Sequence, residues 1–241
     1  MKKLPDNSID LVVTDPPYNV SKKETINRTG GKFGNNRDIK LDFGEWDYGS
    51  ILPVDYIDEF VRLLTKNGVL CLFYDKLFLG MIGFYLQEKY NFQVRHIGAW
   101  VKNNPAPQAR KVKWMNGMEN FLIATVNHGT GHHFNYELGQ SPDYFNHVVN
   151  YEHLHPTQKP LELFKWIINY WSFEGDMILD PFIGSGTTAV ACIELNRNFI
   201  GYEIDEEYYN VALKRLSKYD NDYSKQVIES KRPQQQYFFE E

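Results

Sequence analysis

Cysteine is scarce in this sequence, and long apolar runs are missing. The 241 residues contain two cysteines, Cys71 and Cys192, and each lies inside a short apolar run. We therefore expect buried thiols of a cytoplasmic protein rather than a disulfide framework. No apolar stretch approaches the roughly 18 residues that a membrane span needs, and the first residues, from Met1 to Asp6, form no hydrophobic leader. These features exclude a membrane-spanning protein and a small secreted disulfide scaffold.

Net charge is also small, but its distribution along the chain is uneven. The formal net charge is −5. Residues 21–40 nevertheless carry six cations against two acids, and residues 101–114 carry four cations and no acid. Two basic segments on an acidic body are typical of a protein that contacts a polyanion at one face, although solvated loops are the alternative explanation. The cations that we single out are Lys22, Lys23, Arg28, Lys32, Arg37, Lys102, Arg110, Lys111 and Lys113.

The apolar pattern alternates between short runs and stretches with helical spacing. Apolar residues make up 42% and charged residues 24%, as in ordinary globular domains. Strands alternating with helices predict a mainly parallel sheet that is covered on both faces, which is an α/β fold. Strands are expected at 9–14, 69–74, 92–101, 121–126, 177–179 and 199–204, and helices at 56–66, 77–90, 161–171, 187–195 and 206–218.

Two segments interrupt this rhythm within what we expect to be one domain over 1–241. Residues 19–50 are rich in Gly, Asn and Lys, and residues 103–152 are rich in His, Asn and Gly. Loops of this length in an α/β domain are usually functional. The tail over 219–241 is polar and is expected to be loosely ordered.

The first motif with chemical content is Asp15-Pro16-Pro17-Tyr18, which directly follows the first predicted strand. Ligands of parallel sheets bind at the carboxyl ends of the strands. Two prolines make this strand exit rigid and donate no backbone N–H. The Asp15 carboxylate and a fixed backbone carbonyl are then two neighbouring acceptors that can hold an amino group by both hydrogens. Tyr18 offers a flat face beside them.

The second motif is a strand, a glycine turn and a helix start over residues 179–188, which include Gly184, Ser185 and Gly186. Glycines allow a ligand to approach the backbone, and a helix N-terminus presents unpaired N–H groups. The Lys-Ser/Thr pair of a phosphate-binding P-loop is absent. Glu203 lies at the end of the next predicted strand, at a spacing from the turn where a carboxylate can accept both hydroxyls of a ribose. An adenosine-containing ligand is therefore expected.

A third motif, His155-Pro156-Thr157-Gln158-Lys159-Pro160, precedes a predicted helix. Together, these three motifs and their order resemble those of the permuted (β-group) DNA amino-methyltransferases. In that family the Asp-Pro-Pro-Tyr motif comes first and the cofactor motif lies near the C-terminus. The likeness covers roughly residues 4–218. It implies a Rossmann-like methyltransferase fold that is mainly parallel and doubly wound, with an antiparallel strand and a circularly permuted motif order.

The resemblance also implies the chemistry. The cofactor would be S-adenosylmethionine, the product S-adenosylhomocysteine, and no metal would take part. The methyl group would go to the exocyclic amine of a base flipped out of double-stranded DNA. Adenine N6 is favoured because the motif begins with Asp, and cytosine N4 is the alternative. A non-catalytic DNA-binding subunit that keeps the fold is an alternative of another class.

Site residues follow from the matched positions. The catalytic residues would be Asp15, Pro16, Pro17 and Tyr18, where Tyr18 stacks on the base and Asp15 and the Pro16 carbonyl accept the amine hydrogens. The residues expected to contact the cofactor are Asp15, Thr157, Lys159, Asp180, Phe182, Gly184, Ser185, Gly186, Thr187 and Glu203. Segment 19–50 would cover the flipped base, 103–152 would be a small target-recognition region, and the cations named above would contact DNA.

Two departures from the family pattern bear on cofactor and partners. Family members usually carry a Gly-Asp pair roughly 20 residues before Asp-Pro-Pro-Tyr, and here Met1 falls after that point. Asp205 and the tail are candidates to replace its acid. The recognition region is small, so a homodimer or a separate specificity subunit is a possible partner. No sulfur or carboxylate stands at metal-ligand spacing beside His128, His132 or His133, so no metal site is expected.

Overall fold

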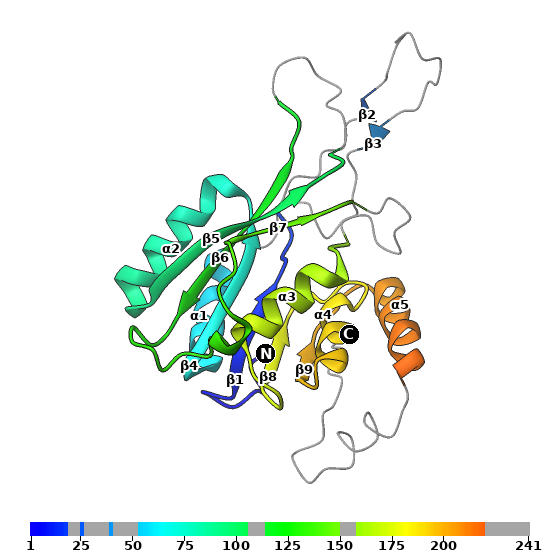
Figure 1. Ribbon diagram of the computed structural model, residues 1–241. Helices are drawn as coiled ribbons and strands as arrows, with labels where there is room; N and C mark the ends of the chain where they lie inside the picture. The colour runs from blue at the N-terminus through cyan, green and yellow to red at the C-terminus, as the bar shows by residue number, and fades with distance from the viewer. Residues whose placement is uncertain (19–24, 27–38, 41–52, 106–113, 150–157, 220–241) are drawn as a thin grey trace.

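The structure is a computed structural model that describes residues 1–18, 25–26, 39–40, 53–105, 114–149 and 158–219 (Figure 1). Its centre is a seven-stranded sheet in the order β7-β5-β6-β4-β1-β8-β9. The strands are β1 (Ile9–Thr14), β4 (Leu64–Tyr74), β5 (Gln93–Lys102), β6 (Met118–Thr125), β7 (Tyr144–His147), β8 (Met177–Asp180) and β9 (Asn198–Gly201). A separate antiparallel pair joins β2 (Thr25–Ile26) to β3 (Ile39–Lys40).

Strand direction confirms the predicted fold class. β1 pairs in parallel with β4 and β8, β8 with β9, and β5 with β7. Within this sheet of the described chain, β6 alone runs against both of its neighbours. The sheet is therefore mainly parallel with one antiparallel strand. The carboxyl ends of six strands and the amino end of β6 share one edge.

Helices cover both faces of the sheet, as the alternating pattern predicts. α1 (Pro53–Leu63) and α2 (Lys76–Tyr90) pack on one face, where Phe60 and Leu79 meet Leu70 and Leu122. α3 (Leu161–Trp171) and α4 (Thr187–Glu194) pack on the other. α5 (Glu206–Leu216) lies beside α4, and two short 3-10 turns span Tyr136–Leu138 and Ser217–Tyr219. Burial of apolar side chains on both faces is the main stabilising contribution to such a layered fold.

The predicted elements are present, with three differences. β4 begins at Leu64, directly after α1 ends at Leu63, so Asn67-Gly68 lies inside the strand rather than in a loop. β7 was not expected, because its four residues alternate in burial within a polar segment. The pair β2–β3 also escaped prediction. No helix in the described residues is long and apolar enough to cross a membrane.

Candidate active site

Three acidic residues lie at the carboxyl ends of adjacent strands. Asp15 directly follows β1, Asp180 is the last residue of β8, and Glu203 lies two residues beyond the end of β9. Because β1, β8 and β9 are parallel neighbours, these carboxylates share one edge of the sheet. This edge is where open α/β sheets bind their ligands.

The Asp15 carboxylate is held from two sides. Its Oδ1 accepts a hydrogen bond of 2.7 Å from the Tyr18 hydroxyl, and its Oδ2 forms an ion pair with the ammonium of Lys159. Burial raises the pKa of Asp15, while the positive charge of Lys159 acts in the opposite direction. Each carboxylate oxygen can accept more than one hydrogen bond. Asp15 is thus a fixed acceptor with capacity left for a further donor.

Tyr18 is oriented by the same contacts. Its ring centroid lies 5.3 Å from that of Tyr74, and the Lys159 Nζ lies 5.7 Å from the Tyr18 ring centroid. Burial, followed by the neighbouring Asp15 charge, raises the pKa of Tyr18 well above its usual value, so the hydroxyl remains a donor. Between them, Pro16 is buried and Pro17 half-buried. The motif is a rigid strand exit, as predicted.

Lys159 lies between two acids. Its ammonium pairs with Asp15 and lies 3.0 Å from Glu119 Oε2, and its contact with the cofactor carboxylate stays a prediction. Although burial opposes it, these two carboxylates raise the pKa of Lys159, which keeps its charge. A cofactor carboxylate at Lys159 would have to share this ammonium with both acids.

Glu119 is a site residue that the sequence analysis missed. It is the second residue of β6, and because β6 is antiparallel its amino end meets the carboxyl ends of its neighbours β4 and β5. Glu119 also pairs with Lys102. Burial alone would raise the pKa of Glu119, but Lys159 and Lys102 hold it at about 2. An acid within an apolar strand would have been the only sequence signal.

The glycine turn is shaped by backbone geometry. Gly184 and Gly186 have positive φ angles of 53° and 81°, a region that disfavours other residues. A Cβ at Gly186 would also lie 3.0 Å from the Cβ of Ala212. The Gly184 N–H donates to Glu203 Oε2 at 2.8 Å, and the Asp205 N–H donates to Glu203 Oε1 at 2.9 Å. Glu203 is thus fixed beside the turn, and burial raises its pKa.

Asp180 stabilises the glycine turn by hydrogen bonds. Its Oδ1 accepts hydrogen bonds from the Thr14 hydroxyl at 2.7 Å and the Phe182 N–H at 3.1 Å, and its Oδ2 accepts one from Thr188. Burial raises the pKa of Asp180 to about 6. Asp180 was expected to face the cofactor, and in this structure its contacts are with the protein that forms the turn.

Arg215 of α5 is a second residue that sequence reasoning missed. Its Nη1 donates to the Ser185 backbone oxygen at 2.7 Å, to Ser185 Oγ at 3.0 Å and to Thr187 Oγ1 at 3.2 Å. Both hydroxyls were predicted to contact the cofactor. Arg215 therefore holds the start of α4 in place from outside the predicted motif.

Two buried polar atoms test whether this edge fits S-adenosylmethionine. The Tyr56 hydroxyl and Gln158 Oε1 are buried and have no hydrogen-bond partner among the described residues. Tyr56 packs edge-on against Phe182 at 5.5 Å, and Gln158 immediately precedes Lys159. Unsatisfied buried groups are costly unless a ligand or water completes them. Together with Glu203 and the glycine turn, they fit a polar, adenosine-containing cofactor.

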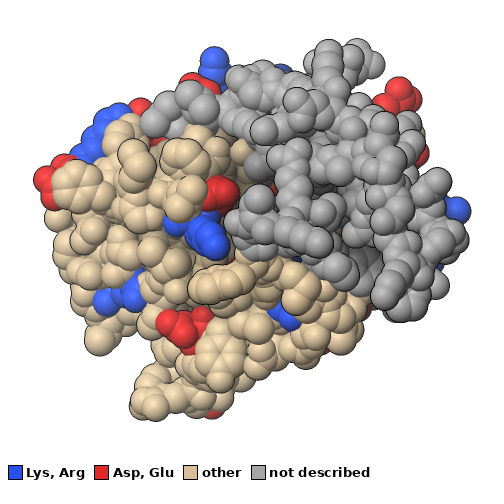
Figure 2. Space-filling model, turned by 90° about the horizontal axis from the view of Figure 1, so that it is seen from above, with Lys and Arg blue, Asp and Glu red and all other residues tan. Residues whose placement is uncertain are grey.

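Many predicted contacts lie outside the described residues. These are Thr157 and the DNA-contacting candidates Lys22, Lys23, Arg28, Lys32, Arg37, Arg110, Lys111 and Lys113. Lys102 is described, and its ammonium faces inward, paired with Glu119 and 5.0 Å from the Trp100 ring centroid. Its contact with DNA therefore stays a prediction, in which Lys102 would share its charge with Glu119. On the described part of this face, basic and acidic groups are interspersed (Figure 2).

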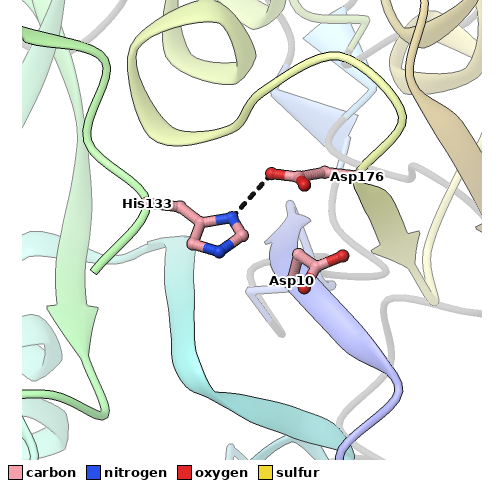
Figure 3. Close-up of side chains that lie close together, drawn as sticks. All are labelled: Asp10, His133 and Asp176. Carbon is pink, nitrogen blue, oxygen red and sulfur yellow. Dashed lines mark hydrogen bonds and ion pairs between the residues drawn. The ribbon is translucent and has the colours of Figure 1, made fainter. Parts of the chain in front are cut away.

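A cluster of one histidine and two aspartates lies at the opposite end of the strands. Asp10, His133 and Asp176 place ligand-type atoms within 4.8 Å of one another (Figure 3). The expectation that no carboxylate lies near the histidines is therefore wrong for His133. Asp176 Oδ2 already accepts from the Phe173 N–H at 2.8 Å and lies 2.6 Å from His133 Nδ1, and Asp10 Oδ2 accepts from Met177 N–H at 2.9 Å. We interpret the cluster as a hydrogen-bonded ion pair that ties the loop after β6 to the sheet.

This pair predicts a pH-dependent stability. The hydrogen bond to Asp176 raises the pKa of His133 above its ordinary value of about 6.5. The contribution of this ion pair to the free energy of unfolding is therefore complete below the unfolded-state pKa of His133. It is lost as the pH rises through the folded-state pKa of His133. In urea unfolding at several pH values, the free energy of unfolding should decline more steeply with rising pH for the wild type than for His133→Gln. The exposed His128→Gln is the control, and equal slopes for wild type and His133→Gln would contradict the assignment.

Solved structures share this arrangement of elements. The structure matches that of the M1.HpyAVI–SAM complex with a TM-score of 0.66 and 30% sequence identity, covering 89% of this chain and 91% of that one. It also matches the cytosine-N4-specific PvuII DNA methyltransferase with a TM-score of 0.68, covering 93% of this chain and 85% of that one. At 15% identity, the second likeness concerns the fold alone.

The sequence comparisons agree with the structural ones. The type II methyltransferase M2.DpnII of Streptococcus pneumoniae is 32% identical over 235 residues, which cover 90% of this chain and 85% of that protein. Residues 9–214 match the profile of the DNA methylase family of N6 and N4 methyltransferases. This match includes Asp15, the glycine turn and Glu203, the residues on which the resemblance was based. The chain belongs to the DNA methylase family.

Proposed function

We propose that this DNA methyltransferase transfers a methyl group from S-adenosylmethionine to the N6 amine of an adenine flipped out of double-stranded DNA. The observation that carries the proposal is the Asp15 carboxylate, fixed by Tyr18 and Lys159 at the end of β1, beside the glycine turn and Glu203. The assignment of adenine rests on the Asp-Pro-Pro-Tyr form of the motif. The intact acid and turn argue against a non-catalytic subunit.

Each residue of the motif has a distinct task in this proposal. S-adenosylmethionine, when bound, supplies an electrophilic methyl group. Tyr18 stacks on the flipped base, and Asp15 and the Pro16 carbonyl accept the two amine hydrogens, which orients the nitrogen lone pair. The amine becomes acidic as it gains the methyl group, and Asp15, whose pKa burial raises, accepts the proton that leaves. Most of the acceleration comes from positioning and fixed electrostatics.

The cofactor contacts complete the proposal. Glu203 would accept the ribose hydroxyls, and Phe182 and Tyr56 would line the adenosine. The turn from Gly184 to Thr187, which Asp180 and Arg215 support, would hold the methionine end. Asp205 caps α5 by accepting from the Glu207 and Tyr208 N–H groups, so its carboxylate is already engaged.

The base can be identified without knowing the target sequence. The protein is incubated with S-adenosylmethionine labelled in the methyl group and with unmethylated genomic DNA, which contains every short target sequence, and the DNA is then hydrolysed to nucleosides. Label in N6-methyldeoxyadenosine supports the proposal. Label in N4-methyldeoxycytidine supports the N4 alternative, and no label in the DNA supports a non-catalytic subunit.

DNA binding is proposed to depend on the basic segments 21–40 and 101–114. If their cations contact phosphates, the logarithm of the binding constant should fall by about 0.9 per contacted phosphate for each tenfold rise in salt. Fluorescence anisotropy with a labelled duplex at several salt concentrations measures this slope. Single-stranded DNA of the same sequence is the comparison, and a response to salt that is flat would contradict contacts by both segments.

A second copy of the chain is the proposed protein partner, and α2 is the proposed contact. α2 is apolar on both sides: Leu79, Ile82, Gly83 and Leu86 are buried, yet it is the outermost helix at the left of Figure 1. A surface helix normally carries polar residues on its outer side, and α2 does so only at its two ends, with Lys76 and the stretch 87–89. Its exposed apolar side chains are Leu77, Phe78, Met81 and Phe84, with exposed fractions of 76%, 49%, 67% and 65%.

The adjoining sheet surface extends this apolar face. Gly83 packs against Val94 and Leu122, and Ile97 pairs with Leu122, so Ile97 points to the α2 side. The strand registers place three half-exposed side chains on that side: Ile97, Met118 and Tyr144. With the four on α2 they form an exposed apolar face of seven side chains on one side of the molecule. A symmetric dimer is the commonest way to cover such a face.

Sedimentation equilibrium tests the dimer. The wild type should sediment as a dimer, and Met81→Glu should shift it to monomer, because a carboxylate cannot be buried in an apolar interface without a partner. Gln87→Glu places the same charge on an exposed part of the same helix and should leave the dimer intact. A wild type that stays monomeric at all concentrations would contradict the proposal.

Two further properties follow from the proposed role. The enzyme would act in the cytoplasm, where its DNA substrate lies and where the buried thiols of Cys71 and Cys192 remain reduced. As a relative of type II methyltransferases, it would modify DNA within a restriction–modification system.

A further inference from the structure

Four side chains of alternating charge form a row that begins at the Asp15 carboxylate. The Lys159 ammonium lies between Asp15 and Glu119, and Glu119 lies between Lys159 and Lys102. The four groups come from the end of β1, the segment before α3, β6 and β5. Their side chains expose between 6% and 20% of their surface. Coulombic interactions in such a place are screened much less than at the surface.

Glu119 determines where the Lys159 ammonium sits. Aromatic rings also surround the Lys159 ammonium. Its Nζ lies 5.7 Å from the Tyr18 ring centroid and 5.5 Å from that of Phe73, so the position of the side chain is restricted. Without Glu119, its charge would act on Asp15 alone. The Asp15 carboxylate would then be a poorer acceptor for an amine, because the ammonium would neutralise it more completely.

We propose that Glu119 is a positioning residue for methyl transfer, which anchors Lys159 and thereby sets the orientation and acceptor strength of Asp15. This rests on the proposed function, in which Asp15 accepts the hydrogens of the target amine. Glu119 touches neither base nor cofactor in this account. Lys102 completes the arrangement, because it balances the charge of Glu119 and holds its second oxygen.

Glu119→Gln is the principal variant, since it keeps the size of the side chain and removes its charge. We expect kcat to fall about 10-fold, less than the 10²–10³-fold typical of a group that directly stabilises the transition state. The KM values for cofactor and DNA should change little. Glu119→Asp restores the charge and should recover part of kcat. The control is Asp58→Asn, which removes an exposed ion pair with Lys89 far from the site.

A second measurement does not depend on activity. The pKa of Asp15 can be followed by carbon NMR of the cofactor-free protein with labelled aspartate. The titratable groups that face Asp15 are Tyr18, Tyr56, Lys159, Glu119 and Asp180. Removing the negative charge of Glu119 should lower the pKa of Asp15. Lys102→Met removes one of the two cations that compensate the charge of Glu119, so it should move the pKa of Asp15 upward.

The outcomes separate this inference from the proposed function. A lower kcat with opposite shifts of the Asp15 pKa in the two variants supports the positioning role. A folded Glu119→Gln protein with unchanged kcat and unchanged Asp15 titration overturns it, as does a loss of thermal stability alone. If the wild type methylates no adenine, the proposed function fails, while the NMR titration still reports whether Glu119 acts on Asp15. Should Glu119→Gln fail to fold, Lys102→Met carries the same test with the opposite sign.

Discussion

Replacing Asp15 by alanine is expected to abolish methyl transfer, with a loss of at least about 10³-fold in kcat. The carboxylate is the acceptor that orients the amine, and burial makes it a better proton acceptor than an exposed aspartate. Cofactor affinity should stay within a few-fold of the wild type, because Glu203 and the glycine turn are untouched. Single-turnover label transfer measures the first effect, and calorimetric titration with S-adenosylmethionine measures the second.

Asp15→Asn is the matched control for this prediction. Asparagine keeps the shape of the side chain and can still accept from Tyr18, but it cannot take up a proton or pair with Lys159. It should retain more activity than alanine and less than the wild type. Full turnover by Asp15→Ala would show that the role given to Asp15 is wrong.

Replacing Lys159 by methionine is expected to destabilise the fold by about 3–5 kcal/mol, the usual cost of removing one partner from a buried ion pair. The loss would leave two buried carboxylates, Asp15 and Glu119, facing each other without the ammonium between them. Urea unfolding at neutral pH measures the free energy of unfolding. The expected loss is large against the 5–15 kcal/mol that holds a typical domain together.

Two further variants identify the cause of that loss. Lys165→Met removes a more exposed lysine that pairs with Glu194 at 2.9 Å, and its cost should be below about 1 kcal/mol. The double variant Lys159→Met/Asp15→Asn removes the stranded charge, since Glu119 keeps its ion pair with Lys102, and it should recover part of the stability. A double variant no more stable than Lys159→Met would mean that lost packing, not unpaired charge, explains the effect.

Much of the fold and part of the site were accessible from the sequence. The apolar runs of β1 and β8 are short, β-branched and followed by turn residues, so their identity as buried strands was clear. Placing Asp15, Asp180 and Glu203 at one edge required only the rule that parallel strands end together. β7 could not be predicted, because a short edge strand with polar residues has no distinctive pattern.

The main feature that the sequence did not reveal is which groups the charged residues pair with. Lys102 and Lys159 were read as cations for DNA and cofactor, since a sequence displays a charge and not its neighbour. The structure pairs both with Glu119, which depends on β6 running antiparallel, so that its amino end meets the carboxyl ends of β4 and β5. The same limit applies to His133, whose carboxylate partners come from the start of β1 and from the turn before β8.

The central claim is that Asp15 directs a methyl group to the N6 amine of adenine. The most direct test is mass spectrometry of nucleosides from duplex DNA treated with S-adenosylmethionine and either the wild type or Asp15→Asn. We expect N6-methyldeoxyadenosine from the wild type and much less of it from the variant. N4-methyldeoxycytidine as the product, or equal yields of N6-methyldeoxyadenosine from the two proteins, would contradict the claim.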